Sequence, residues 1–351
     1  MKPKITNPIT GALLLAGCIS TQPAWAAPQE KLTVALYGGN WGEAFLGCVA
    51  EPFTKATGIA VAAEVGTSTT TLAKLQQQKA KPTIDVAWMD GGISELAYAA
   101  GVLDDLDPAS IPNLANVQDK ALYRDADHLF AVGSGYYSLG LTYNTQEIKQ
   151  APTSWKDLWR PEYAGAITIP SPANSAGVPF VFFLADVWGV DPANLAPLYS
   201  KLAALDTALY FDSSGAASNA FQSGEAIIGA HFSVGAWDLI DKGAPIAFTL
   251  PSEGAWATDT RLHLIKNGPN NAAARRFIDT ALTKEASACL ASKLYLGPAV
   301  KDVTVADDVA RKLPWGVGGS IDSLKLFDWS RINARRADVT NDWNRQVTGK
   351  Q

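Results

Sequence analysis

The chain has 351 residues, of which 47% are hydrophobic and 18% charged, a composition typical of globular proteins and a length that suits about two domains of about 150 residues. Its 29 basic residues stand against 34 acidic ones, a formal charge of −5, and no Lys/Arg run occurs, which disfavours nucleic acid or an anionic membrane as the main partner. No apolar stretch reaches the ~18 residues that a membrane-spanning helix needs.

The N-terminus predicts export to the periplasm. Two lysines precede an uncharged apolar stretch at residues 9–19, and Ala24-Trp25-Ala26 follows as an A-x-A site. This order is typical of a cleavable signal peptide, here residues 1–26. Leu15-Ala16-Gly17-Cys18 also resembles a lipobox, so lipid anchoring at Cys18 is the alternative to cleavage after Ala26.

Removal of residues 1–26 leaves two cysteines, Cys48 and Cys289. Their spacing excludes a CxxC redox or zinc pattern. Two cysteines in an oxidising compartment can form a disulfide, and free cysteines can equally pack as small hydrophobic side chains. From the residues alone both alternatives stay open.

Strands alternate with helices at the start of the mature chain. The strand Leu32–Tyr37 is followed by a tight turn at Gly38-Gly39 and by a helix that Asn40 can cap. We expect Pro52 to kink or break this helix before it ends at Gly58. The remaining elements of this unit are a strand at 59–64, a helix at 70–78 and a strand at 84–88. The alternation predicts a parallel sheet covered on both faces.

A second α/β unit follows a connection at 104–127, which is rich in Asp, Asn and Pro and is expected on the surface. The predicted strands are 138–143, 166–169, 208–211, 226–230 and 246–250, and the predicted helices are 178–188 and 194–205. An extended segment at 253–265 and helices at 271–282 and 285–293 come next, before a more polar tail. Two such units, with a late segment that returns to the first, predict a two-lobed molecule.

The sequence offers little catalytic or metal chemistry. It has 3 histidines and neither an HExxH pattern nor a Cys/His cluster, so neither a metal nor another cofactor is expected. His231-Phe232-Ser233-Val234-Gly235 approaches the G-x-S-x-G nucleophile elbow, but has His at the first Gly position. A secreted hydrolase that uses Ser233 is therefore a rival hypothesis, and a loop serine is the simpler explanation.

The junction at Gly38-Gly39 is more informative. Ligands of open parallel sheets bind beyond the carboxyl ends of the strands, where helix N-termini offer free N–H groups to anions. A tight turn without a ligand explains the same residues, so the junction alone does not establish a site.

Four stretches carry a resemblance to a known family. They are LTVALYGGNWGEAFLGCVAEPFTKATGIAV (32–61), TSWKDLWRPEYAG (153–165), QSGEA (222–226) and PSEGA (251–255). In this order they resemble the extracellular solute-binding proteins of ABC importers, and the spermidine/putrescine-binding branch in particular.

The resemblance implies an α/β fold of the periplasmic-binding-protein type II, with two doubly wound sheets joined by crossing hinge strands. It implies a first lobe of residues 31–138 plus 259–300 and a second of 139–258 plus 301–351. Cys48 and Cys289 then share the first lobe, which favours the disulfide. The implied protein is a monomeric receptor, not an enzyme, that delivers a solute to a membrane permease and its ATPase subunit.

The resemblance also implies a set of ligand-binding residues, because polyamine binders enclose the alkyl chain with aromatic rings and hold ammonium groups with carboxylates. Carried over by position, these residues are Trp41, Asp90, Tyr136, Tyr137, Phe232, Trp256, Asp259 and Tyr295. Ser175 is a ninth candidate, which comes from the residues themselves and not from the resemblance.

One departure from the polyamine binders leaves the solute open. The stretch Pro170–Gly177 contains no carboxylate, and Ser175 suits an oxygen or an anion. A polyamine, a shorter amine or an amino acid with its ammonium group at Asp90 or Asp259 is expected, and an anionic solute is the alternative.

Overall fold

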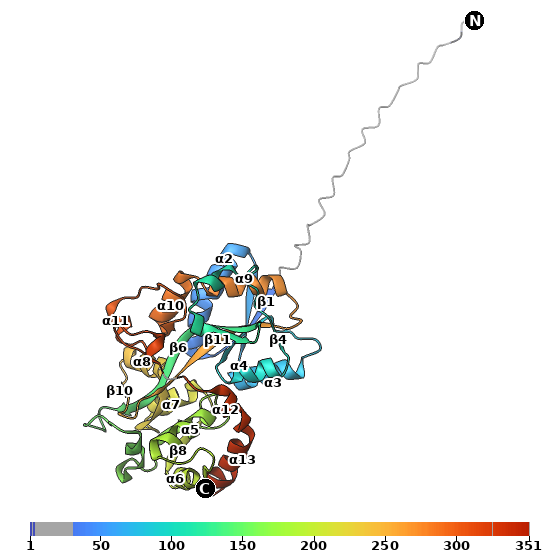
Figure 1. Ribbon diagram of the computed structural model, residues 1–351. Helices are drawn as coiled ribbons and strands as arrows, with labels where there is room; N and C mark the ends of the chain where they lie inside the picture. Colours follow the sequence, from blue (N-terminus) through green and yellow to red (C-terminus); the bar gives the residue numbers. More distant parts are fainter. Residues whose placement is uncertain (2, 4–30, 325, 351) are drawn as a thin grey trace.

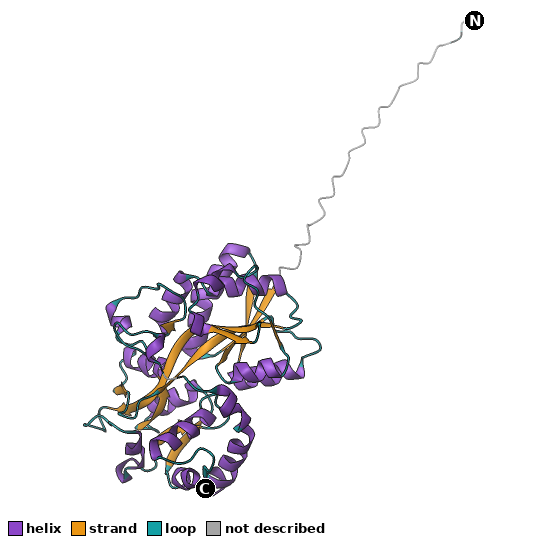
Figure 2. Cartoon of the chain, in the orientation of Figure 1, coloured by secondary structure: helices purple, strands orange, loops and turns teal. Residues whose placement is uncertain are grey.

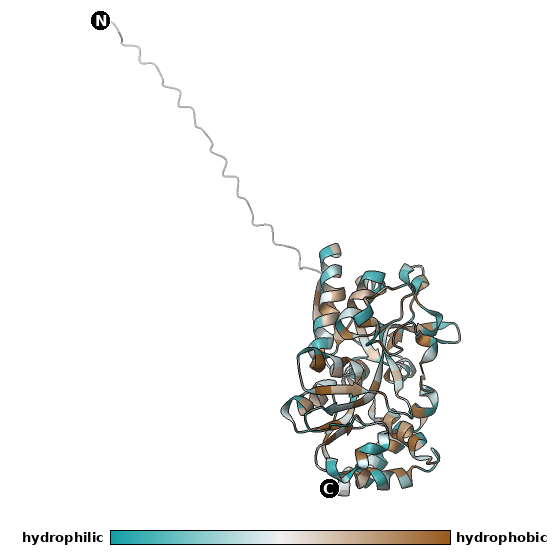
Figure 3. Ribbon diagram, turned by 90° about the vertical axis from the view of Figure 1, so that its left-hand side faces the viewer, coloured by the Kyte–Doolittle hydropathy of each residue, from teal (hydrophilic) through white to brown (hydrophobic). Residues whose placement is uncertain are grey.

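The computed structural model describes residues 1, 3, 31–324 and 326–350, so nearly all of the predicted signal peptide, including Cys18, lies outside the described residues. Figure 1 shows two lobes, one above the other, with strands passing between them. In Figure 2 helices cover the strands of both lobes. In Figure 3 the hydrophobic segments lie mainly in the interior and the hydrophilic ones on outer helices and loops.

The first lobe is built on parallel strands. β1 pairs in parallel with β2 and β3, and β11 joins β3 in the antiparallel direction. The strands are β1 (Lys31–Leu36), β2 (Ala60–Val65), β3 (Val86–Asp90), β4 (Leu103–Asp104) and β11 (Trp256–Ile265). The helices are α1 (Gly39–Phe45), α2 (Glu51–Thr57), α3 (Ser68–Gln77), α4 (Ile93–Ala99), α9 (Asn271–Ala281) and α10 (Lys284–Leu294). β3 and β11 are buried along their whole length, as strands covered on both faces are.

The second lobe repeats the pattern, with β7 parallel to both β8 and β9. Its strands are β7 (Ile167–Pro170), β8 (Thr207–Phe211), β9 (Ile228–Phe232) and β10 (Ile246–Thr249). Its helices are α5 (Gly177–Trp188), α6 (Ala196–Ala203), α7 (Ser214–Ser223) and α8 (Ser233–Asp241). Short 3-10 helices also occur along the chain, at Pro112–Asn116, Asp119–Ala121, Trp155–Trp159, Pro161–Tyr163, Ile321–Ser323 and Thr348–Lys350.

A long strand, β6 (His128–Asn144), joins the lobes. It pairs with β11, β5 (Leu122–Asp125) and β12 (Gly297–Pro298) of the first lobe and with β9 and β10 of the second. The ladder therefore runs without interruption in the order β2-β1-β3-β11-β6-β9-β7-β8. The predicted mixed α/β fold with crossing strands is confirmed. The crossing strands join the strands of the two lobes into one hydrogen-bonded sheet.

The tail contacts both lobes. It contains α11 (Asp307–Ala310), α12 (Trp329–Ala334) and α13 (Arg336–Gln346). α13 packs on α5 and α6 of the second lobe. Nearer the start of the tail, the Trp315 ring lies 6.4 Å from that of Tyr136 in the first lobe. The lobe boundaries stay a prediction, since residues 301–351 are shared between the lobes.

The first helical segment ends at Gly58 as predicted, but it differs from its prediction at its start and at its break. α1 begins after Gly38 in extended backbone, so Asn40 lies inside the helix and does not cap it. The predicted break occurs one turn before Pro52, as a π-helix over Leu46–Ala50. Pro52 itself occupies the first turn of α2, where its missing N–H costs no hydrogen bond.

A disulfide joins Cys48 in this π-helix to Cys289 in α10, with 5.6 Å between the two Cα atoms. The bridge fastens the first helical segment of the lobe to its last. The connection at 104–127 is also less exposed than predicted, because its apolar side chains Ile111, Leu114, Val117 and Ala121 are buried.

Candidate ligand-binding site

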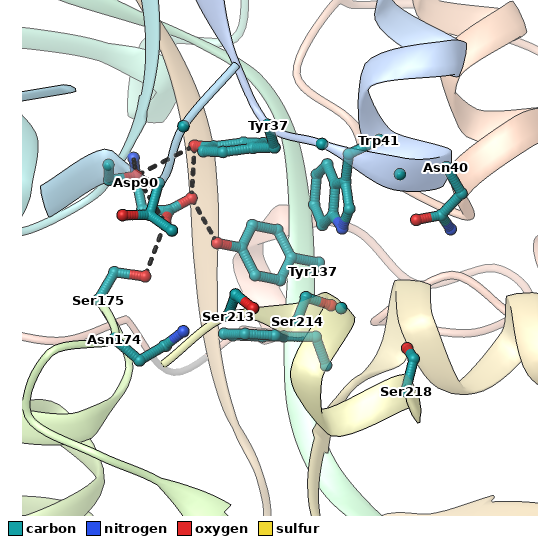
Figure 4. Close-up of a pocket in the computed structure, with 17 residues that line it drawn as sticks. Tyr37, Asn40, Trp41, Asp90, Tyr137, Asn174, Ser175, Ser213, Ser214 and Ser218 are labelled. Carbon is teal, nitrogen blue, oxygen red and sulfur yellow. Dashed lines mark hydrogen bonds between the residues drawn. The ribbon is translucent and has the colours of Figure 1, made fainter. Parts of the chain in front are cut away.

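A cavity of about 260 Å³ lies between the lobes, at the carboxyl ends of the parallel strands. The first lobe supplies the starts of α1 and α3 and the end of β3. The second lobe supplies the loop before α5, the start of α7 and the end of β9. Figure 4 shows these walls facing one another across the cavity.

Asp90 is the one carboxylate among the described residues of the cavity wall. Its Oδ1 accepts hydrogen bonds from the hydroxyls of Tyr37 (2.7 Å) and Tyr137 (2.6 Å), and its Oδ2 from those of Ser68 (2.9 Å) and Ser175 (2.7 Å). None of the described wall residues is Lys, Arg or His, and Asp90 forms no ion pair within residues 31–324 and 326–350. Within the described wall, the Asp90 carboxylate therefore accepts hydrogen bonds from four hydroxyl groups but has no cationic side chain beside it.

The two tyrosines stay protonated beside this carboxylate. Burial, and then the negative charge of Asp90, raise the pKa of the Tyr37 hydroxyl well above its ordinary value. The same two causes, in the same order, raise the pKa of the Tyr137 hydroxyl. Both hydroxyls therefore remain hydrogen-bond donors at neutral pH.

Direct hydrogen bonds connect the lobes at this point. Ser175 belongs to the second lobe, so its bond to Asp90 crosses the cleft. A second crossing bond runs from the Thr69 hydroxyl at the start of α3 to the carbonyl oxygen of Ala173 (3.0 Å). The described arrangement is a closed one.

Aromatic rings form another part of the wall. The Trp41 ring meets those of Tyr37 and Tyr137 edge to face, at centroid distances of 5.4 and 5.1 Å. Phe232 continues the row, 5.5 Å from Tyr137. Such a wall suits an alkyl chain, and ring faces also attract cations.

Five of the nine predicted ligand residues line this cavity: Trp41, Asp90, Tyr137, Ser175 and Phe232. Four others lie elsewhere: Tyr136, Trp256, Asp259 and Tyr295.

Two of these four are aromatic residues on the crossing strands, Tyr136 and Trp256. Neighbouring residues of a strand point to opposite faces, so Tyr136 points away from the cavity that Tyr137 lines. Its hydroxyl lies 3.2 Å from that of Tyr123. Trp256, on β11, packs its ring 5.0 Å from Phe327 in the tail.

Asp259 is occupied by a buried ion pair. Its Oδ2 lies 2.9 Å from Arg261 Nε, and both side chains are 2% exposed. Arg261 also binds Glu95 at 2.6 Å and stacks over the ring of Tyr123. Burial raises the pKa of Asp259, and the positive charge of Arg261 opposes that shift. An aspartate neutralised in this way has no free charge for an ammonium group.

Tyr295 takes part in a contact between the lobes away from the cavity. Its hydroxyl donates to Asp241 of α8, and Lys312 from the tail binds both groups. The trio holds α10 of the first lobe against α8 of the second.

Several wall residues were missed by the sequence prediction: Tyr37, Asn40, Thr67, Ser68, Asn174, Ser213, Ser214 and Ser218. Most of them lie near strand ends or helix starts, which is where ligands of open α/β sheets bind. Ser213, for example, comes two residues after β8 ends and caps α7 by accepting a hydrogen bond from the N–H of Ala216. That helix was not predicted, so its serines were overlooked.

The nucleophile–base pair of a hydrolase does not form at Ser233 in the described residues. Ser233 is 1% exposed, and its Oγ accepts a hydrogen bond from the backbone N–H of Ser138 (3.2 Å). The nearby His231 directs its Nε2 to Ser218 instead, at 3.0 Å. Ser233 and His231 therefore each bond to another residue, and the histidine is not placed to activate the serine as a nucleophile.

The described residues contain neither a metal-binding cluster nor a membrane-spanning helix. No group of three or more His, Cys, Asp or Glu side chains in this part of the chain is placed to hold a metal ion. No helix there has the length and apolar character needed to cross a membrane.

Known proteins resemble this chain over most of its length. The profile of a family described as "Bacterial extracellular solute-binding protein" matches residues 49–313. The "Spermidine/putrescine-binding periplasmic protein 1" of Haemophilus influenzae is 27% identical over 271 residues, which cover 76% of this chain and 74% of that protein.

Solved structures extend the likeness to the fold. The crystal structure of an ABC transporter from Clostridium perfringens is 25% identical, with a TM-score of 0.69, and covers 90% of this chain and 99% of its own. The periplasmic binding protein AfuA from Actinobacillus pleuropneumoniae, with fructose-6-phosphate bound, reaches a TM-score of 0.73 at 21% identity, over 91% of this chain and 99% of its own. One similar protein is thus named for polyamines and another holds a sugar phosphate, so the fold does not fix the ligand.

Proposed function

The chain belongs to the bacterial extracellular solute-binding proteins, and we propose that it captures a small solute bearing an ammonium group, which binds at Asp90. Its relatives and structural neighbours are periplasmic solute-binding proteins of ABC transporters and not enzymes. The family implies a periplasmic location and a membrane transporter as partner. The class of solute is inferred from the residues of the cavity wall.

One observation carries the proposal: Asp90 is a buried carboxylate without a cation. Hydroxyl donors stabilise its charge but do not neutralise it, and an isolated charge away from water is costly. An ammonium group supplies the missing positive charge, and it can replace a serine hydroxyl as a donor to the carboxylate. The rings of Trp41 and Tyr137 add a cation–π attraction beside it.

The same wall disfavours the two other classes of solute. A long polyamine needs a carboxylate for each distant ammonium group, and Asp90 is the one acid on the described wall. A purely anionic solute meets no Lys or Arg there and is repelled by Asp90. A monoamine or an amino acid fits better than either.

Closure of the lobes is the event that the solute controls. The wall includes Trp41 and Asp90 from the first lobe and Ser175 and Phe232 from the second. A solute that touches both groups stabilises the closed form over the open one, which is the form a transporter can recognise.

The test measures solute affinity by calorimetry with alkylamines, diamines, spermidine, amino acids and simple carboxylates. Replacing Asp90 with asparagine keeps the shape and removes the charge, so we expect amine affinity to fall about 10- to 100-fold, the effect of losing a hydrogen bond to a charged group. Asp238→Asn, on the surface of α8, is the matched control, since it removes one carboxylate outside the cavity. Equal binding of amine-free carboxylates, or an Asp90→Asn affinity within twofold of wild type, would contradict the proposal.

We further propose that residues 1–26 direct export and are removed. Intact mass and N-terminal sequencing of protein from the periplasmic fraction test this. A mature chain that begins at Ala27 is the expected result, and a lipid-modified Cys18 at the N-terminus would contradict it.

A further inference from the structure

The end of the cavity remote from Asp90 presents hydrogen-bond donors. Figure 4 shows Asp90 on one side and Asn40 and Ser218 on the other. Asn40 lies in the first turn of α1 in the first lobe, and Ser218 lies in α7 of the second. The Nδ2 atom of Asn40 is buried and has no hydrogen-bond partner within the described part of the chain. A buried N–H without an acceptor is rare in folded proteins, so this group points to a missing acceptor.

The hydrogen of the Ser218 hydroxyl is directed by its neighbour His231. His231 is fully buried, and burial lowers its pKa to about 3, so the ring is neutral and carries one N–H. Its Nε2 lies 3.0 Å from Ser218 Oγ, whereas its Nδ1 has no partner among the described residues. A proton on Nδ1 would be a buried donor without an acceptor, which costs more than a bare ring nitrogen. The proton therefore sits on Nε2 and is donated to Ser218.

Ser218 then accepts from the histidine and keeps its own hydrogen for another partner. Within residues 31–324 and 326–350 this hydroxyl donates to no other protein group. Its open direction is the cavity that it lines, close to the start of α7, whose free N–H groups favour negative charge.

We propose that the amide of Asn40 and the hydroxyl of Ser218 hold a carboxylate of the solute, so that the solute is an amino acid bound by its two charged ends. This inference rests on the proposed function, since Asp90 holds the ammonium end. A carboxylate is acceptor-only and has two oxygens, one for each donor. Because the donors come from different lobes, the carboxylate also links them, and His231 acts as a positioning residue for Ser218.

The first experiment compares amino acids of increasing chain length with the alkylamines of the same length, by calorimetry on the full chain. At the best length, we expect the amino acid to bind at least tenfold more tightly than its alkylamine. Ser218→Ala should reduce this advantage tenfold or more. Ser223→Ala is the matched control, because it removes a serine hydroxyl from the same helix outside the cavity.

A second variant reverses the preference. Asn40→Asp replaces the donor with a carboxylate, so we expect amino acids to lose affinity and diamines of the same length to gain it. Long-range ¹⁵N–¹H spectra of the wild-type protein report the tautomer of His231, with the Nε2–H form expected. A circular dichroism spectrum and melting temperature like those of the wild type show that each variant is folded.

The outcomes separate this inference from the proposed function. Two results would contradict the carboxylate site at Asn40 and Ser218 and leave the ammonium site at Asp90 intact. One is that amines bind through Asp90 but a carboxylate adds no affinity. The other is that Asn40→Asp leaves the preference between amino acids and diamines unchanged. An Nδ1–H tautomer removes Ser218 as a donor and overturns its role. If amine-free carboxylates bind and Asp90→Asn has no effect, the proposed function fails as well.

Discussion

Removing the disulfide should lower the stability of the protein by a large fraction. Cys48 and Cys289 are separated by 241 positions in the sequence, so the bridge closes a loop that spans most of the mature chain. The chain-entropy model gives such a loop about 5.5 kcal/mol at 25 °C, because the cross-link removes conformations from the unfolded state. Whole domains are typically stable by about 5–15 kcal/mol, so the double substitution Cys48→Ala and Cys289→Ala should be easily measured.

The assay is equilibrium unfolding in urea at 25 °C, without reductant, for the wild type and the double variant. We expect a lower midpoint and a larger m-value in the variant, because its unfolded state is no longer held compact by the cross-link. Wild type with added reductant should reproduce the variant. Neither cysteine lines the cavity, so solute affinity should stay within twofold.

Two results would refute this reasoning. One is an unchanged midpoint in the double variant. The other is a titration that finds two free thiols in the unfolded wild-type protein under oxidising conditions, which would mean that the bridge does not form.

Two further predictions concern buried charge. Asp259→Asn leaves the buried Arg261 without its one fully buried carboxylate partner in the described residues, and with the more exposed Glu95 as its remaining ion-pair partner there. We therefore expect the free energy of unfolding in urea to fall by about 3–5 kcal/mol with solute affinity within twofold; a tenfold loss of affinity at unchanged stability would assign Asp259 to the ligand instead. Burial lowers the pKa of His231 and of His263 from 6.5 to about 3. The unfolded chain then binds more protons than the folded one between pH 3 and 6.5, and stability falls as the pH falls through that window, by about 1.4 kcal/mol per pH unit for each histidine. Urea midpoints at pH 7.5, 6.0 and 5.0 check this, and a flat profile would contradict it.

The fold was predictable from the sequence because its main signals are local. Strands such as β1 and β3 are short apolar runs bounded by glycines or polar residues, and they fall within two residues of their predicted bounds. The helices α4, α7 and α8 were missed, and so were the helices of the tail. α7 has the sequence SGAASNAFQS, whose small and polar residues give a weak apolar pattern, and it is stabilised by packing and by the Ser213 cap.

The candidate site was only partly predictable, because its geometry depends on pairings distant in the sequence. The position of Asp90 at a strand end can be inferred locally, but its four hydroxyl partners come from the turn after β1, from α3, from β6 and from the loop before α5. Asp259 was predicted as a ligand residue because it follows the aromatic Trp256 on an extended segment. Its pairing with Arg261 two positions later depends on both side chains sharing one face of β11, which the sequence does not distinguish from a ligand site.

The C-terminal tail affects how the empty protein behaves. Asn333 donates to the carbonyl oxygen of Gly92 in the first lobe (2.7 Å), and Arg335, two residues later, donates to that of Pro192 in the second (3.1 Å). When the lobes separate, this short segment must break one of the two hydrogen bonds or change its conformation. Opening therefore has a free-energy cost that does not depend on the bound molecule. Sequence changes in the tail can therefore tune the resting proportion of open protein, and with it the apparent dissociation constant, without touching any atom that recognises the cargo.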